Sequence, residues 1–207
     1  MKRRTLSLST LVGGLMAFGF SAGAQADGHV AELLWERDNA AFASYDKILL
    51  KPLDLQDVKV LKPVWAQDDA DDWVIEGEVS DDIQTMFDEI MSRELSGENG
   101  FTLVDEAGPG VMQIEVEFLS ITPYVKPGTA SGAGGMEIST LGSGDVHVSA
   151  ELRDSVTGSV LSLIEGERQI GTEYRELSPE NHQANLMATF SDWGQRLREY
   201  LIVKQAQ

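Results

Sequence analysis

Apolar and polar residues alternate at every second position in two segments of this chain. In residues 112–118, Met, Ile, Val and Phe are separated by Gln and Glu, and residues 146–153 repeat the alternation. Successive side chains of a β-strand point to opposite faces of a sheet. Each segment therefore predicts a strand with one face in the core and the other in solvent.

Three further apolar runs predict strands at 45–52, 101–105 and 160–170. Pro52 ends the first run, because proline cannot donate to a β-ladder. The segment 154–158 ends in Gly158 and has the composition of a tight turn. We therefore expect 146–153 and 160–170 to form a hairpin.

Apolar residues at spacings of three and four predict two amphipathic helices. The first should begin at Ser80 as its N-cap and end at Gly97. Its apolar stripe consists of Ile83, Phe87, Ile90, Met91 and Leu95. The second should begin at Ser178, with Pro179 at its first position. Its stripe consists of Leu186, Phe190, Trp193, Leu197 and Leu201.

The predicted order is β-α-β-β-β-β-α, which gives the fold class α+β. Short connections between the strands favour a mostly antiparallel sheet of about five strands, with the two amphipathic helices on one face. We expect one domain at residues 45–207, preceded by an N-terminal arm at residues 27–44. Residues 54–79 form a long, Asp-rich connection within the domain.

Residues 1–26 have the pattern of a secretory signal peptide. Lys2, Arg3 and Arg4 precede the apolar run 6–20, and the small residues Ala24 and Ala26 stand where a signal peptidase reads, so we expect cleavage after Ala26. The run is too short and too interrupted for a membrane span, which needs roughly 20 apolar residues. The arginine pair leaves the twin-arginine route open, but its partial motif favours the general secretory route.

The amino-acid composition indicates where the mature protein is located and which classes of partner it can bind. The chain has no Cys, so we expect neither disulfides nor a lipid anchor, and a mature protein in the periplasm or secreted. It has 16 Lys and Arg against 34 Asp and Glu, a net charge of −18. Such a charge repels nucleic acid and anionic lipid and favours basic or divalent partners. The oligomeric state stays open.

Several segments together resemble a family of bacterial envelope proteins called domain of unknown function 3313. They are residues 45–52, 101–111, 151–158 and the final helix with Trp193, and the resemblance covers roughly residues 40–202. It implies an envelope protein without assigned catalytic residues. It also implies a lipoprotein, but this chain has Ala26 and Asp27 where such relatives carry a Cys.

The sequence gives little support for a catalytic site. His29, His147 and His182 are too few and too scattered to indicate zinc without cysteine. Ser143 lies before a strand and not in a nucleophile elbow, which is typical of many hydrolases. We therefore expect no enzyme and no cofactor.

The long connection holds the candidate binding residues. Asp68, Asp69, Asp71 and Asp72 offer oxygen ligands on a loop, as calcium prefers, but without EF-hand spacing, and a solvated loop is the alternative. Trp65 and Trp73 flank this cluster and either pack on the sheet or anchor a partner.

The leading hypothesis is a non-enzymatic binding domain of the bacterial cell envelope, which contacts an envelope protein through its open sheet face or the 54–79 connection. The alternative is a periplasmic protein that carries a small ligand or a divalent cation such as calcium. A hydrolase has the least support.

Overall fold

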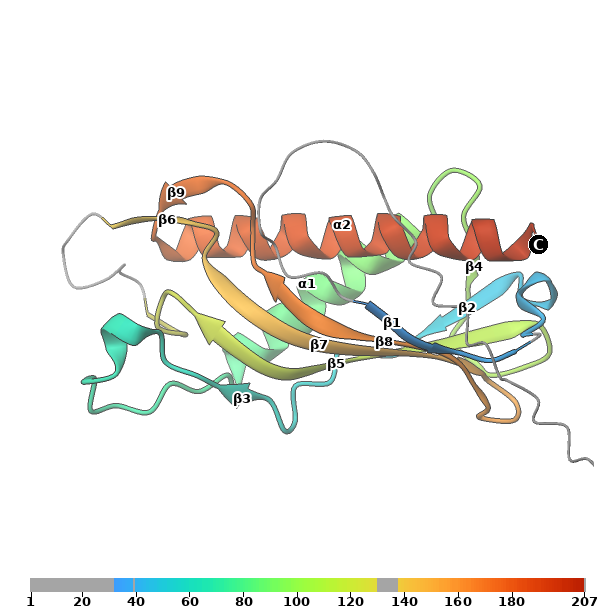
Figure 1. Ribbon diagram of the computed structural model, residues 1–207, viewed down its shortest axis with the longest axis horizontal. Coiled ribbons are helices and arrows are strands. Elements are labelled where there is room, and N and C mark those ends of the chain that lie inside the picture. The colour runs from blue at the N-terminus through green and yellow to red at the C-terminus, as the bar shows by residue number, and fades with distance from the viewer. Residues whose placement is uncertain (1–31, 39, 130–137, 207) are drawn as a thin grey trace, which may run out of the picture.

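The computed structural model describes residues 32–38, 40–129 and 138–206, so the expected cleavage site at Ala24 and Ala26 lies outside the described residues. One twisted sheet is covered by two helices (Figure 1). The elements are β1 (Glu32–Glu36), β2 (Lys47–Leu50), β3 (Lys59–Val60), α1 (Glu78–Leu95), β4 (Thr102–Leu103), β5 (Val111–Pro123), β6 (Ser139–Leu141), β7 (Gly144–Asp154), β8 (Val160–Gln169), β9 (Tyr174–Glu176) and α2 (Pro179–Gln205), with short 3₁₀ turns at η1 (Phe42–Ser44) and η2 (Val64–Ala66).

The sheet is centred on the long strands β5, β7 and β8. Within the described residues it has seven strands in the order β1-β8-β7-β5-β2-β4, with β3 also beside β5, and β6 and β9 form a separate ribbon. β5, β7 and β8 are antiparallel neighbours, and the turn between β7 and β8 has Gly158 at φ +69°. The two alternating segments and the hairpin predicted from the sequence are thus confirmed.

The sheet is mixed, and the expectation of a mostly antiparallel sheet of about five strands was wrong. β2 runs parallel to β4 and β5, and β3 runs parallel to β5. The reason is the connection: α1 carries the chain back along the sheet, so β5 starts at the same end as β2. Such a crossover joins parallel strands, whereas a short turn joins antiparallel ones.

Four strands were not expected: β1 and β3 of the main sheet, and β6 and β9 of the separate ribbon. β1 lies within the predicted arm 27–44 and forms an edge of the sheet beside β8. β3 lies within the predicted connection 54–79. Residues 33–35 are consecutive apolar residues without alternation, and β3 is two residues long, so neither segment carries a strand pattern.

Both helices follow their predicted stripes. α1 begins at Glu78, earlier than expected, because Gly77 takes the cap position with φ +54° in place of Ser80. α2 begins as predicted, where the hydroxyl of Ser178 accepts a hydrogen bond from the backbone N–H of Asn181 at 3.2 Å. In the described residues, no helix is both long and apolar enough to cross a membrane.

The core lies between the helices and one face of the sheet. The rings of Phe87 in α1 and Phe190 in α2 meet edge to face, with centroids 5.3 Å apart. Phe118 of β5 lies 6.3 Å from Phe190 and 6.1 Å from Trp193. Both helices therefore cover the same sheet face, as expected, and among the described residues no helix covers the opposite face, which we call the open face.

Candidate functional site

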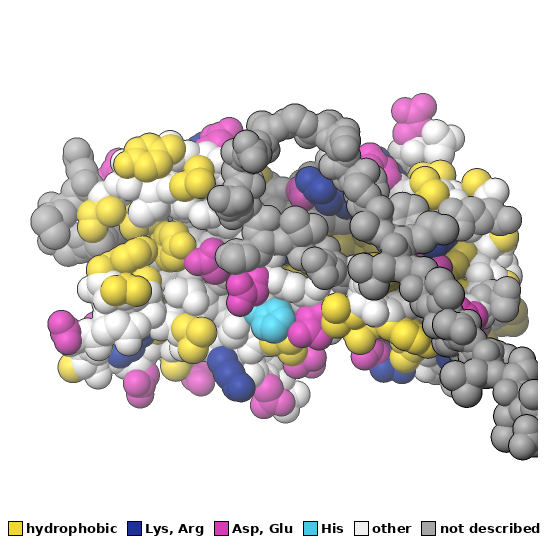
Figure 2. Space-filling model, viewed as in Figure 1, with side chains coloured by type: hydrophobic (Ala, Val, Ile, Leu, Met, Phe, Trp, Pro, Cys, Tyr) yellow, Lys and Arg dark blue, Asp and Glu magenta, His cyan; other side chains and the backbone are white. Residues whose placement is uncertain are grey.

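The open face of the sheet is acidic. Glu115 and Glu117 of β5, Glu151 of β7 and Glu165 of β8 lie on neighbouring strands, with side chains on the face away from the helices. Figure 2 shows acidic side chains gathered around a histidine over the strands. His147 of β7 lies on this face, with Nε2 3.1 Å from a carboxylate oxygen of Glu165. The face thus carries carboxylates where a buried face would carry apolar residues.

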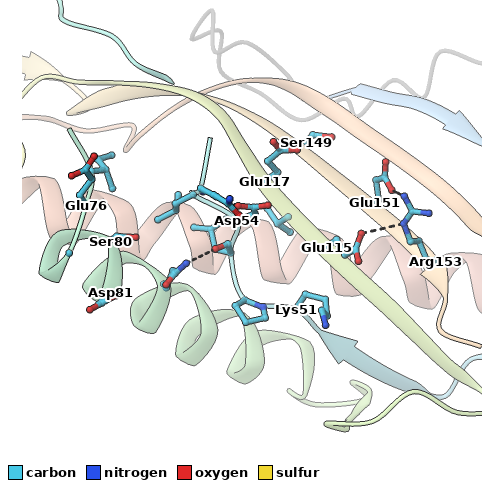
Figure 3. Close-up of a pocket in the computed structure, with 18 residues that line it drawn as sticks. Lys51, Asp54, Glu76, Ser80, Asp81, Glu115, Glu117, Ser149, Glu151 and Arg153 are labelled. Atoms are coloured by element: carbon cyan, nitrogen blue, oxygen red, sulfur yellow. Dashed lines mark hydrogen bonds and ion pairs between the residues drawn. The ribbon is translucent and has the colours of Figure 1, made fainter. Parts of the chain in front are cut away.

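A groove opens at the edge of this face, where the chain leaves β2 and passes the start of α1 (Figure 3). Its volume is about 800 Å³. Leu53, Leu55, Ile75 and Val116 are buried beneath it. The carboxylates of its lining are Asp54, Glu76, Asp81, Glu115, Glu117 and Glu151, and its cations are Lys51 and Arg153. We call this feature the acidic groove.

Arg153 joins two carboxylates on adjacent strands of the acidic groove. Glu115 and Glu151 are directly opposite each other in the register of β5 and β7. The Nε of Arg153 lies 3.3 Å from Glu115, and another guanidinium nitrogen contacts Glu151. Like charges opposite each other destabilise a sheet, and this guanidinium offsets that repulsion.

Asp69 organises the loop at residues 61–74. Its carboxylate accepts a hydrogen bond from the indole N–H of Trp73 at 2.9 Å and from the backbone N–H of Asp71 at 3.0 Å. Lys126 of the segment after β5 pairs with Asp69 at 3.4 Å and with Asp71 at 2.7 Å. The hydrogen bond from Trp73, followed by those from Asp71 and Lys126, lowers the pKa of Asp69 to about 2. The loop is therefore fixed to the body of the domain.

The two tryptophans proposed as partner anchors have different surroundings. Trp73 is 8% exposed and belongs to the core side of the loop. Trp65 is 52% exposed, and its ring and that of Tyr124 meet edge to face with centroids 5.1 Å apart. The structure thus leaves Trp65, and not Trp73, accessible to another molecule.

Further exposed apolar residues accompany Trp65 at this end of the molecule. Tyr124, which contacts Trp65, also donates its backbone N–H to the carbonyl of Ser143, next to the β6–β9 ribbon. Leu141 and Tyr174 of this ribbon are paired and exposed. Figure 1 shows η2 and the β6–β9 ribbon at the same end. We define the apolar end by its exposed residues Leu61, Val64, Trp65, Val74, Leu141 and Tyr174.

The four aspartates proposed as calcium ligands do not converge. Asp69 and Asp71 hold Lys126, whereas Asp68 and Asp72 are exposed to solvent. Across 32–38, 40–129 and 138–206, no three His, Asp or Glu side chains gather as a metal site requires. Calcium binding by this loop stays a prediction, and the contacts of Asp69 assign it a structural role.

Ser143 and His182 are brought together by the fold, although they were considered separately in the sequence. Nδ1 of His182, in the first turns of α2, lies 3.0 Å from the hydroxyl of Ser143 before β7. Burial lowers the pKa of His182, which favours the neutral imidazole. Ser143 is 2% exposed, so its hydroxyl is closed to a substrate. This pair therefore links α2 to the sheet and does not form a reachable nucleophile.

Distant similarities to solved structures cover most of the chain. A PelC dodecamer from Paraburkholderia phytofirmans is 10% identical, with a TM-score of 0.39, over 82% of this chain and 98% of that one. A Xanthomonas campestris protein of family DUF330 is 11% identical, with a TM-score of 0.43, over 86% and 95%. A putative neuraminyllactose-binding hemagglutinin homolog from Helicobacter pylori is 6% identical, with a TM-score of 0.39, over 84% and 97%.

No curated protein matches the chain. A family model does match, over residues 22–197, and its description is "protein of unknown function (DUF3313)". The resemblance inferred from the strand, turn and helix segments is thereby confirmed. The chain belongs to the family DUF3313.

Proposed function

We propose that this chain is a non-enzymatic binding domain, exported to the bacterial cell envelope, which contacts another envelope protein through its apolar end. Export is supported by the basic, apolar and small-residue pattern of residues 1–26. Membership of a family without assigned chemistry is compatible with a binding role.

The observation that carries the proposal is the exposure of Trp65 and Val64 on a loop that is held in place. Val64 is 87% exposed and neighbours the half-exposed indole of Trp65 in η2. Asp69 and Lys126 fix the loop that presents them. Exposed aromatic and aliphatic groups are typical anchors of protein interfaces. A preformed loop also loses less conformational entropy on binding than a mobile one.

The buried serine and histidine give a hydrolase no support, since a substrate cannot reach Ser143. The scattered aspartates of the 61–74 loop give calcium no particular support either. The binding role is therefore the function that the geometry supports best.

The test is quantitative capture from envelope extract with matched variants of the chain. Trp65→Ala removes the central anchor, and Val156→Ala removes another exposed apolar side chain from the β7–β8 turn at the other end of the sheet. A hot-spot side chain contributes about 2 kcal/mol or more, so a true partner should be recovered more than about tenfold less by Trp65→Ala. Val156→Ala should recover it fully.

Two outcomes would overturn the proposal. The first is recovery of the same proteins by the parent chain and both variants. The second is self-association: a sedimentation coefficient that rises with concentration in the parent chain, but not in Trp65→Ala, would show that a second copy covers the apolar end.

A further inference from the structure

We propose that protonation of His182 opens the base of the apolar end, where α2, the β6–β9 ribbon and the chain after β5 meet. The apolar end is then ordered at neutral pH and loosened in acid, so that it binds more weakly there. The opening follows from contacts within the chain and needs no partner, whereas its effect on binding rests on the proposed function.

Ser143 connects the parts of this base. Its backbone N–H donates to the carbonyl of Ile170, after β8, at 2.8 Å. Its carbonyl accepts from the backbone N–H of Tyr124, the residue whose ring meets that of Trp65, at 2.9 Å. Its hydroxyl lies 3.0 Å from Nδ1 of His182 in α2. A shift of Ser143 therefore reaches both the ribbon and the loop that presents Trp65.

The β6–β9 ribbon has little stability of its own. It consists of three residue pairs, and its side chains are mostly exposed. A two-stranded sheet without further packing is marginally stable at best in water. Hydrogen bonds from Gly142 to the carbonyl of Glu173 and from Leu177 to that of Ile138 extend it at its two ends. We therefore expect the ribbon to open locally, before the main sheet unfolds.

The position of His182 makes its protonated form unfavourable in the folded chain. The residue lies in the first turns of α2, where the positive end of the helix dipole repels a cation. Burial also lowers the pKa of its imidazole. A neutral imidazole can accept the hydroxyl proton of Ser143 at Nδ1, whereas an imidazolium has only donors. The hydroxyl then has to turn to the carbonyl of Ile170, 3.4 Å away, which already accepts the backbone N–H of Ser143.

The charged side chains around this base do not neutralise an imidazolium. Asp145 of β7 accepts the hydroxyl of Tyr124 at 2.7 Å, and Glu173 pairs with Arg175 of the ribbon. Within the described residues, no carboxylate forms an ion pair with His182, so its positive charge lacks a counter-ion. The other charged side chains on these elements are Arg168 of β8, which interacts with Asp192 and Arg196 further along α2, and the exposed Glu176 and Glu180.

The test is amide hydrogen exchange of the full chain, measured residue by residue with NMR at about pH 7.5 and about pH 5.5 and corrected for intrinsic exchange rates. An imidazole with its ordinary pKa of 6.5 in the open state should reduce the protection of the base by up to about tenfold between these pH values. The reporters are the hydrogen-bonded amides of Tyr124, Gly142, Ser143 and Leu177.

The reference amide is that of Gly158, which donates to the carbonyl of Asp154 in the exposed β7–β8 turn. Opening of this turn does not free His182, so its protection should not change. His182→Gln should keep the reporters equally protected at both pH values, because glutamine does not titrate. His147→Gln, on the open face, should behave like the parent chain. The ring-proton shifts of His182 in the parent chain need no variant and should titrate below pH 6.5.

Four results would contradict the proposal. Unchanged protection of the reporters would show that acid does not open the base. The same loss in His182→Gln would assign the opening to another group. An equal loss at Gly158 would show that the hairpin loosens together with the base. Titration of His182 at or above pH 6.5 would show that the folded chain tolerates the imidazolium.

Capture from envelope extract tests the effect on binding separately. A partner that Trp65→Ala fails to recover should be recovered less by the parent chain at about pH 5.5, but equally at both pH values by His182→Gln. Absence of any such partner at neutral pH would overturn the proposed function while the exchange result stands. Recovery by the parent chain that does not depend on pH would overturn the effect of the opening on binding.

Discussion

The indole N–H of Trp73 donates a hydrogen bond of 2.9 Å to the carboxylate of Asp69. The same carboxylate faces Lys126 on the segment that follows β5. The buried indole therefore fixes the position of the carboxylate, and the carboxylate fixes the loop to the sheet. This relationship explains how a loop rich in like charges presents Trp65 in a defined position.

Trp73→Ala and Trp65→Ala should differ sharply in their effect on stability. Trp73 is buried, and truncation of a buried tryptophan costs about 3–5 kcal/mol. Trp65 is half exposed, and substitutions at such surfaces change the free energy of unfolding by about 0.5 kcal/mol. Urea denaturation of the two variants measures the difference. Equal losses would mean that Trp65 is also part of the core.

The free energy of unfolding should decrease as the pH falls below about 6.5. Burial lowers the pKa of His182 from its ordinary value of 6.5, so the unfolded chain binds a proton at a higher pH than the folded chain. The stabilisation is present above pH 6.5 and is lost as the pH falls through the lower pKa of the folded state. Urea midpoints at a series of pH values measure the slope.

His182→Gln should remove most of this slope, because glutamine does not titrate and can still reach the hydroxyl of Ser143. His147→Gln is the matched control, since the side chain of His147 lies 34% exposed on the open face. The pH dependence of stability could instead disappear in His147→Gln and persist in His182→Gln. That result would contradict its assignment to His182.

Gly171→Ala should destabilise the protein more than Gly158→Ala. Both glycines have positive φ, +80° and +69°, and a left-handed conformation costs an alanine about 1–2 kcal/mol. A Cβ on Gly158 meets nothing within 4 Å, whereas a Cβ on Gly171 would approach the Cβ of Asn185 to 2.7 Å. Thermal melting compares the two variants directly. Similar melting temperatures would show that the chain near Asn185 can move to accommodate the added Cβ without loss of stability.

Phe190→Ala should be among the most damaging substitutions in α2. Its ring is fully buried between Phe87, Phe118 and Trp193, and its loss leaves a cavity that costs about 3–5 kcal/mol. Met187→Ala, on the exposed side of the same helix, should change the free energy of unfolding by about 0.5 kcal/mol. Guanidinium denaturation measures both. A small loss in Phe190→Ala would place the centre of the core elsewhere.

The sequence predicted which side chains are buried better than it predicted how the strands run. Ile83, Phe87, Ile90, Met91 and Leu95 are all buried, because a helical stripe is a local property of the chain. Strand direction is not local. The alternation of apolar and polar residues shows which side chains of a strand share a face. It is the same in either chain direction, so it could not predict that β2 pairs with β5 in parallel.

For the candidate sites, too, the sequence indicated residue types, but only the structure shows how these residues are placed. The two tryptophans were suggested by residue type alone, and only packing separates exposed Trp65 from buried Trp73. The acidic groove was not predicted, because Asp54, Glu76 and Glu151 are far apart in the sequence and are brought together only by the tertiary fold. In a chain with 34 acidic residues, no spacing marks these out.

The pairing of β1 with β8 has a consequence for the order of folding. β1 cannot form until β8 exists, and Glu36 at its end contacts Lys204 of α2 at 2.7 Å, although the two are 168 residues apart in the sequence. Closing so long a loop is slow, whereas the β7–β8 hairpin needs only a short one. We therefore expect the hairpins to nucleate the sheet and β1 to join it last, once β8 and α2 are in place.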